Sequence, residues 1–214
     1  MNLEEVWRIR EEEIYPTLFG AKRRGIFALD ASLFKKKFRQ KTIDPRWMQY
    51  GVFEFAPTAS RNSWLYVTSG HSNPWEVSPK DYETSEESGV GVEFTLATNE
   101  QGDWAIAALQ SLLAYDVLQH AGRFPRFQPL GLDHRVPCGG PLNGQRDCVI
   151  RYLVMTEPEG IPDSFVLPSG KVLFAGVTGI SEAEFAEAKA TSSQQVVDRL
   201  RASGFHPVND PHRP

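Results

Sequence analysis

Ser69, His71 and Asp133 are the residues of this sequence that could together supply a nucleophile, a general base and a carboxylate. Such a trio would support hydrolysis, with His71 taking the proton from a hydroxyl group. The serine does not lie in a Gly-x-Ser-x-Gly nucleophile elbow, however, and a chain of 214 residues contains trios of this kind by chance. A hydrolase with His71 as its base is therefore an alternative, and the main prediction is a protein that is not an enzyme.

The sequence contains no cofactor motif. Asp133, His134, Cys138 and Cys148 form its one cluster of metal-ligating types, and their spacing matches no tetrahedral zinc pattern. Neither of the two stretches with closely spaced glycines opens a helix, as a phosphate-binding loop requires. We predict no cofactor and no metal, and we expect the two cysteines to be free thiols in a reducing compartment.

The overall composition is that of a soluble globular protein, with 41% hydrophobic residues, 23% charged residues and a net charge of −4. No apolar run approaches the eighteen or so residues that a membrane-spanning helix needs. The amino terminus, MNLEEVWRIREEE, is charged where a signal peptide would be apolar. These features predict a cytoplasmic protein that does not bind membranes.

Basic residues are concentrated in the segment 22–46, which has nine of them against two acidic residues. A basic segment can bind nucleic acid, and this is a second alternative function. Nucleic-acid-binding domains are usually basic overall and have aromatic residues among their cations, and this chain is acidic. A solvated helix face is the preferred interpretation of the segment.

The stretch Ser63–Trp75, SWLYVTSGHSNPW, organises the rest of the chain. Its first part alternates as a strand over Trp64–Ser69, with Trp64, Tyr66 and Thr68 on one side. A glycine and an Asn-Pro pair then predict a loop that ends at the large ring of Trp75. We expect this strand to deliver four side chains to an exposed rim: His71, Asn73, Trp75 and Glu76. The alternative is that Trp75 fills the core.

An acidic, polar segment, 76–88, follows this stretch and is predicted to be an exposed loop. It includes the adjacent carboxylates Glu86 and Glu87, which would attract a basic partner. The alternative is that the loop only keeps the protein soluble.

The remaining patterns predict strands with helices between them. A helix over Leu3–Ile14 should end at Tyr15-Pro16, and a strand over 89–98 has glycines that allow another backbone to approach closely. A helix with an apolar stripe follows and ends at Gly122. Later elements are a buried strand over 148–155, a hairpin over 165–177, and two helices that begin at the caps Ser181 and Ser192.

These elements predict an α+β fold: a single domain in which helices pack against a mixed, mostly antiparallel sheet. Residues 1–62 should contribute a helix and strands to the same domain as the core, residues 63–204. Residues 205–214 end in NDPHRP and are expected to be a frayed tail.

Six sequence blocks resemble one known family when they are taken together. They occur in the order and approximate spacing of the suppressor of fused domain, and the resemblance covers about residues 64–200. The blocks are WLYVTSGHSNPW (64–75), SGVGVEFTL (88–96), Asp133-His134 with Pro141-Leu142, LVMTEP (153–158), PSGKVLF (168–174) and GVTGISE (176–182). The chain is similar to the stand-alone bacterial form, which lacks the second domain of the animal members.

The resemblance implies a protein-binding function. In the animal protein, a peptide of a Hedgehog-pathway zinc-finger transcription factor is clamped as an added strand between two lobes. Trp75 stands where the family motif has an aromatic residue, so the resemblance assigns a contact role to this residue. Bacterial members are associated with toxin systems, which implies that the partner is a toxin and that this chain is its immunity protein.

Overall fold

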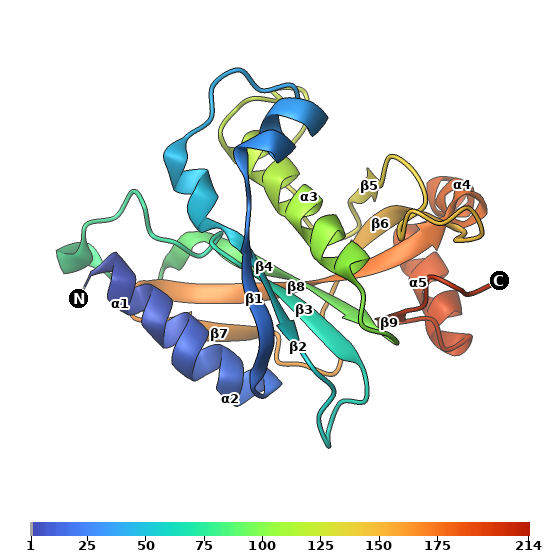
Figure 1. The fold of residues 1–214 in the computed structure, drawn as a ribbon, viewed down its shortest axis with the longest axis horizontal. Coiled ribbons are helices and arrows are strands. Elements are labelled where there is room, and N and C mark those ends of the chain that lie inside the picture. Colours follow the sequence, from blue (N-terminus) through green and yellow to red (C-terminus); the bar gives the residue numbers. More distant parts are fainter. Residues whose placement is uncertain (1) are drawn as a thin grey trace.

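Strands from along the whole chain form one nine-stranded sheet in the computed structural model, which describes residues 2–214 (Figure 1). The strands lie in the order β1-β2-β3-β4-β8-β6-β5, with β7 beside β8 and β9 beside β4. Strand β4 is parallel to β8 and β9, and the other pairs are antiparallel. The predicted α+β fold with a mixed, mostly antiparallel sheet is confirmed. The strands are β1 Lys22–Ala28, β2 Gly51–Phe55, β3 Trp64–Ser69, β4 Glu87–Thr98, β5 Arg135–Pro137, β6 Ile150–Thr156, β7 Ser164–Leu167, β8 Gly170–Ser181 and β9 Val208–Asn209.

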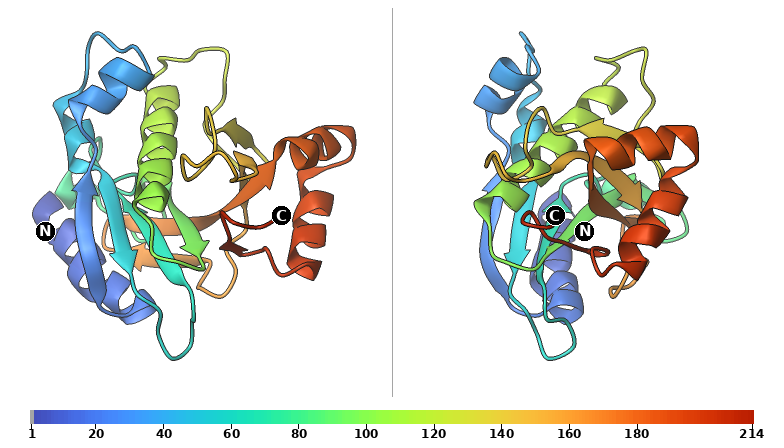
Figure 2. Two further views of the ribbon diagram at one scale, coloured as in Figure 1. Left: turned by 45° about the vertical axis from the view of Figure 1, so that its right-hand side comes forward. Right: turned by 90° about the vertical axis from the view of Figure 1, so that its right-hand side faces the viewer.

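Helices cover both faces of this sheet and one of its ends. The amino-terminal helical segment lies on one face and α3 on the other, while α4 and α5 pack at the end far from the amino terminus (Figures 1 and 2). The amino-terminal segment comprises α1 Leu3–Arg8, a π-helical stretch Ile9–Ile14 and α2 Tyr15–Phe19. The other helices are α3 Asp103–His120, α4 Glu182–Ala190 and α5 Ser193–Ala202, with short helical turns at Leu33–Lys37, Pro45–Gln49 and Pro79–Asp81.

Strand β3 is buried on both faces, and its alternation divides the core in two. Tyr66 points towards α3, in a cluster with Phe94 and Leu96 of β4. Leu65 and Val67 point the other way, into the cluster formed with the amino-terminal helical segment. The predicted strand and its two faces are confirmed, and β3 ends where the loop with Trp75 begins.

The amino-terminal helical segment continues past Pro16, although the sequence predicted that it would end there. Its last turn carries Tyr15 and Phe19, which are fully buried among the phenylalanines of β2, β7 and β8. The Tyr15 hydroxyl also donates to the Thr68 carbonyl oxygen over 2.7 Å. Burial of two large aromatic side chains stabilises this turn by more than the proline destabilises it. In the preceding π-helical stretch, backbone groups pair five residues apart instead of four, so the proline interrupts a different hydrogen-bond pattern from that of an α-helix.

The carboxy-terminal residues are held in place, in contrast to the frayed tail that the sequence predicted. Strand β9 pairs with the end of β4, and the Asn209 side chain accepts from the Gly179 amide at 2.6 Å and donates to two carbonyl oxygens of β4 and β8. Arg213 forms a buried ion pair with Glu184 of α4. Long-range contacts of this kind leave no local pattern, so the polar composition of the segment was misleading.

Other expectations concern the cysteines, metals and membranes. Cys138 and Cys148 are both free thiols, as predicted. Within residues 2–214, no three histidine, cysteine or acidic side chains are arranged to hold a metal ion. In the same range, none of the helices combines the length and the apolar character that crossing a bilayer would require.

Candidate functional site

The loop that follows β3 is held by one buried carboxylate, that of Glu93 on β4. Its Oε1 accepts hydrogen bonds from the Gly70 amide (2.9 Å), the Ser72 amide (3.0 Å) and the Ser72 hydroxyl (2.6 Å). Its Oε2 accepts from the Thr68 hydroxyl at 2.6 Å. A buried carboxylate with four short hydrogen bonds fixes the backbone that donates them, so the start of this loop has one conformation.

Arg10, from the π-helical stretch, supplies the matching positive charge and is fully buried. Its Nη1 donates to Ser72 Oγ (2.9 Å) and Asn73 Oδ1 (2.8 Å) and lies 4.0 Å from Glu93. Burial alone would lower the pKa of Arg10, but the charges of Glu93, Tyr15 and Glu11 together outweigh it, and the pKa is raised. Sequence reasoning missed this residue, because Arg10 in a helix rich in charges looks like its exposed neighbour Arg8.

His71 and Asn73 are buried, in contrast to the exposed rim that the sequence predicted for them. Their exposed fractions are 1% and 2%. The Asn73 Oδ1 accepts from Arg10 and also from Trp7 Nε1, at 2.8 Å. Polar loop residues are buried here because the Glu93 and Arg10 network folds the loop back onto the sheet. Both residues line a hollow beside Trp75, but almost none of their surface reaches solvent, and the Asn73 side chain holds the loop through its bonds to Arg10 and Trp7.

The His71 ring is enclosed beside the carboxyl-terminal end of α3. It lies edge-on to Tyr50 and Phe94, and its Nε2 is 3.7 Å from Asp116 Oδ2. His120 Nε2 lies 3.4 Å from the same oxygen. Neither nitrogen of His71 has a hydrogen-bond partner, so His71 is not paired with a hydroxyl that it could activate. Asp116 and His120, one helical turn apart, were not singled out from the sequence because they lie in a mostly apolar helix.

Burial lowers the pKa of His71, and this predicts how stability changes with pH. Unfolded His71 takes up a proton near pH 6.5 while the folded form stays neutral, so stability is complete above about pH 6.5 and falls below it. His206 has a pKa lowered by burial in the same way. Urea unfolding between pH 7.5 and 5 should show a loss of at most about 1.4 kcal/mol per pH unit for each histidine.

The matched variants of this experiment are His71→Gln and His212→Gln. His71→Gln should reduce the pH slope of the unfolding free energy below pH 6.5, whatever it does to stability at pH 7.5. His212 is exposed, and His212→Gln should leave the slope unchanged. Equal slopes in wild type and His71→Gln would show that His71 is not held neutral by the fold.

Trp75 is half-buried and is held in one orientation by three contacts. Its ring is edge-on to Trp7 at 6.1 Å, its Nε1 donates to the Tyr50 hydroxyl at 3.1 Å, and the Arg46 guanidinium lies 5.9 Å from its ring centre. The ring therefore neither fills the core nor projects freely, and part of it faces solvent. Arg46 also pairs with the exposed Glu76 at 2.6 Å.

Two adjoining hollows lie on this side of the molecule, and Trp75 lines the first of them. The first has a volume of about 290 Å³ and lies between the Trp75 loop, the 45–49 turn and the end of α3. The second has a volume of about 480 Å³ and runs along β4 and β8. Val90 and His120 line both hollows, so they form one surface. We call this the Trp75 surface, and its principal residues are Trp75, Glu76, Val77, Glu87, Val90, His120, Leu132, Glu157, Asp163 and Leu173.

The Trp75 surface combines apolar side chains with carboxylates. Leu132 and Leu173 are large apolar residues with exposed fractions of 52% and 45%. Glu87 lines the second hollow together with Glu157 and Asp163, and Glu86 is exposed just before it. The structure thus brings Trp75, Glu76 and Glu87 of the predicted site onto one surface. It adds apolar residues of β8 and of the loop after α3, which sequence reasoning missed.

Comparison with known families decides what kind of domain carries this surface. The family model described as "Suppressor of fused protein (SUFU)" matches residues 46–214. This chain belongs to the suppressor of fused family. The match includes the Trp75 loop, β4 and β8, which confirms the resemblance inferred from the six sequence blocks. A search of curated proteins found no match.

Three solved structures related to suppressor of fused have the same fold. The crystal structure of Drosophila Suppressor of Fused is 17% identical, with a TM-score of 0.59 over 77% of this chain and 42% of that one. A Sufu-Fu complex is 18% identical, with a TM-score of 0.58 over 77% and 75%. A SUFU homologue from Neisseria gonorrhoeae FA 1090 is 17% identical, with a TM-score of 0.55 over 86% and 92%. The chain thus spans less than half of the Drosophila protein.

Proposed function

We propose that this chain is a protein-binding domain that acts by holding its partner, without catalysis, and that the Trp75 surface is the contact. The observation that carries this proposal is that Trp75 is partly exposed yet fixed on a rigid loop. Partly exposed aromatic residues in pockets are the commonest energetic anchors of protein interfaces. A side chain already held by Trp7 and Tyr50 loses little freedom on binding, which favours affinity.

The chemistry of the surface indicates a basic partner with apolar groups. Carboxylates at Glu86 and Glu87 would accelerate encounter with a positively charged protein, while Leu132 and Leu173 would contact its apolar side chains. We propose that the partner is a toxin and that this chain is its immunity protein, since toxin nucleases have basic clefts. One structure similar to this fold is a complex with a second protein, Fu, which supports binding as the general role.

The test is partner capture with two aromatic variants. Immobilised wild type, Trp75→Ala and Phe127→Ala are exposed to extract of cells that carry the gene, and the captured proteins are quantified by mass spectrometry. Phe127 is 61% exposed but lines neither hollow, so Phe127→Ala tests whether any exposed aromatic residue suffices. A partner bound by wild type and Phe127→Ala should bind Trp75→Ala about tenfold more weakly or worse.

The same experiment tests separately whether the partner is a toxin and whether the Trp75 surface is the contact. If one partner binds all three proteins equally, the Trp75 surface is not the contact, although the chain binds protein. If the captured partner is not a toxin, the immunity role is wrong. If wild type captures nothing that Trp75→Ala does not, protein binding through this surface is wrong.

The two alternative functions have less support. Of the basic residues in segment 22–46, Arg24 pairs with Glu54 and Asp103, and Arg46 pairs with Asp44 and Glu76. Two of the nine basic charges are therefore already compensated, which leaves fewer of them for phosphate groups. A hydrolase would require a nucleophile beside His71, and neither ring nitrogen is hydrogen-bonded to one.

A further inference from the structure

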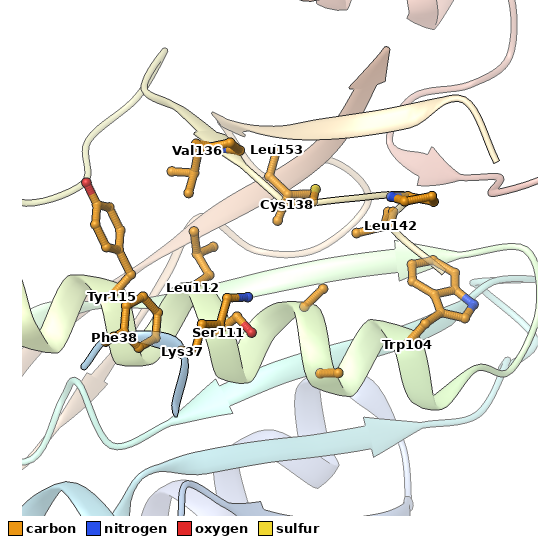
Figure 3. A pocket seen from close by; sticks show the side chains of 14 residues that line it. Lys37, Phe38, Trp104, Ser111, Leu112, Tyr115, Val136, Cys138, Leu142 and Leu153 are labelled. Carbon is orange, nitrogen blue, oxygen red and sulfur yellow. The ribbon is translucent and has the colours of Figure 1, made fainter. Parts of the chain in front are cut away.

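Helix α3 has a second apolar face, which is turned away from strands β2, β3 and β4, against which the helix packs. Ile106 and Leu109 face the core, whereas Trp104, Ala108 and Tyr115 lie on the other side of the helix. An apolar helix face is normally covered by other parts of the chain. Here β5, β6 and the loop between them lie opposite this face and leave a cavity of about 300 Å³ (Figure 3).

The walls of this cavity are mostly carbon. Trp104, Leu112 and Tyr115 of α3 form one wall, and Val136, Leu142 and Leu153 form the opposite wall (Figure 3). Phe38 lies with Tyr115 at one end, and Trp104 lies at the other (Figure 3). No lining residue belongs to the Trp75 surface, so the two sites are separate. Cavities of this size, with apolar walls and few polar groups, are typical of small-molecule sites.

Five side chains with polar groups line the cavity: Lys37, Trp104, Ser111, Tyr115 and Cys138. Burial raises the pKa of the Cys138 thiol to about 12, so this thiol is neutral at physiological pH. Lys37 is the one charged residue of the lining, and no carboxylate lines the cavity with it. The Lys37 side chain reaches solvent at the mouth, yet partial burial lowers its pKa, because no acidic partner compensates the lost hydration.

We propose that this cavity binds a small apolar monocarboxylate, with the carboxylate at the Lys37 ammonium and the hydrocarbon body between α3 and the β5–β6 walls. The carboxylate would supply the negative partner that the Lys37 ammonium lacks, and the apolar body of the ligand would match the carbon walls. Ser111 offers a hydroxyl that can donate to the same carboxylate.

The volume limits the size of the ligand. At roughly 30 Å³ for each small group, 300 Å³ holds about ten non-hydrogen atoms. With the carboxylate group at the mouth beside Lys37, the hydrocarbon body of a straight-chain acid of eight to ten carbons, or of an arylalkanoic acid of similar size, therefore fits. A dianion is disfavoured because the lining contains one cation.

Decanoate, below its micelle concentration, is the probe for this proposal, and binding is measured by calorimetry and by amide chemical shifts. We expect saturable one-to-one binding, with shifts at Trp104, Ser111 and Tyr115. Lys37→Met keeps the apolar stem and should weaken binding about tenfold or more. Lys35→Met, two residues away and outside the lining, is the matched control and should bind as wild type does. Decanol should bind wild type and Lys37→Met equally.

Ala108→Phe fills the cavity and should abolish binding while circular dichroism shows a folded protein. Ser111→Leu is a second filling variant if the first does not fold. The proposal is overturned if decanoate does not saturate, if Lys37→Met binds as tightly as Lys35→Met, or if decanol binds wild type as tightly as decanoate. Dimerisation that Ala108→Phe disrupts, without decanoate binding, would assign the cavity to self-association and would also overturn it.

Discussion

Replacing Arg10 with methionine is expected to lower the free energy of unfolding by about 3–5 kcal/mol. The Arg10 side chain is fully buried, and its removal leaves the Glu93 carboxylate without the positive charge that lies 4.0 Å away. Ser72 Oγ and Asn73 Oδ1 would each lose a charged donor at less than 3 Å. Urea unfolding at pH 7.5 measures the loss.

Arg8→Met is the control for this prediction. Arg8 lies two residues away in the same helical segment, and its ion pair with Glu13 is exposed, so its loss should change stability far less than the loss of Arg10. The double variant Arg10→Met/Glu93→Gln removes both buried charges and should be less destabilised than the sum of its single variants. If Arg10→Met costs no more than Arg8→Met, the buried network does not hold the loop.

Replacing Gly89 with alanine is expected to destabilise the protein by about 3 kcal/mol or more. Gly89 has φ of +61°, and a Cβ added there would lie 2.5 Å from the carbonyl oxygens of both His71 and Asn73. The left-handed backbone costs about 1 kcal/mol for alanine, and displacing the loop backbone adds about 1–3 kcal/mol. Because the displaced backbone carries Trp75, partner binding should weaken in this variant too.

Gly122→Ala separates the cost of the left-handed backbone from the cost of displacing the loop. Gly122 has nearly the same φ, +68°, but no atom lies within 4 Å of an added Cβ. The free energy of unfolding of Gly122→Ala should therefore fall only by the cost of the left-handed backbone, about 1 kcal/mol. Thermal and urea unfolding of the two variants give the difference, and equal losses would show that the close approach of the loop to β4 does not matter for stability.

Local patterns in the sequence predicted most of the fold correctly. The alternation of Trp64–Ser69 placed β3 and its two faces, and the glycines of β4 indicated a close backbone approach that Gly89 makes. The capping box at Ser181 begins α4, and Ser192 caps α5. These features succeed because a strand face or a helix cap depends on residues within a few positions of each other.

The candidate site was predicted only in part. Trp75, Glu76 and Glu87 do lie on one surface, whereas His71 and Asn73 line the same hollow but are almost completely buried. What buries them is the contact of Arg10 with Asn73 and of Glu93 with Gly70, between residues that are 63 and 23 positions apart. A polar loop residue that is buried in such a network is of the same residue type as one that faces solvent, so the local sequence does not distinguish the two.

The sequence by itself therefore determined most of the strands, the helix caps, the family and the position of the aromatic loop. Only the tertiary structure decided which side chains of that loop reach solvent and which charges are buried, and that the far face of α3 encloses a cavity. The physical reason is that burial depends on which distant segments pack together. Secondary structure and motif spacing depend on neighbours along the chain, and those neighbours are visible in the sequence.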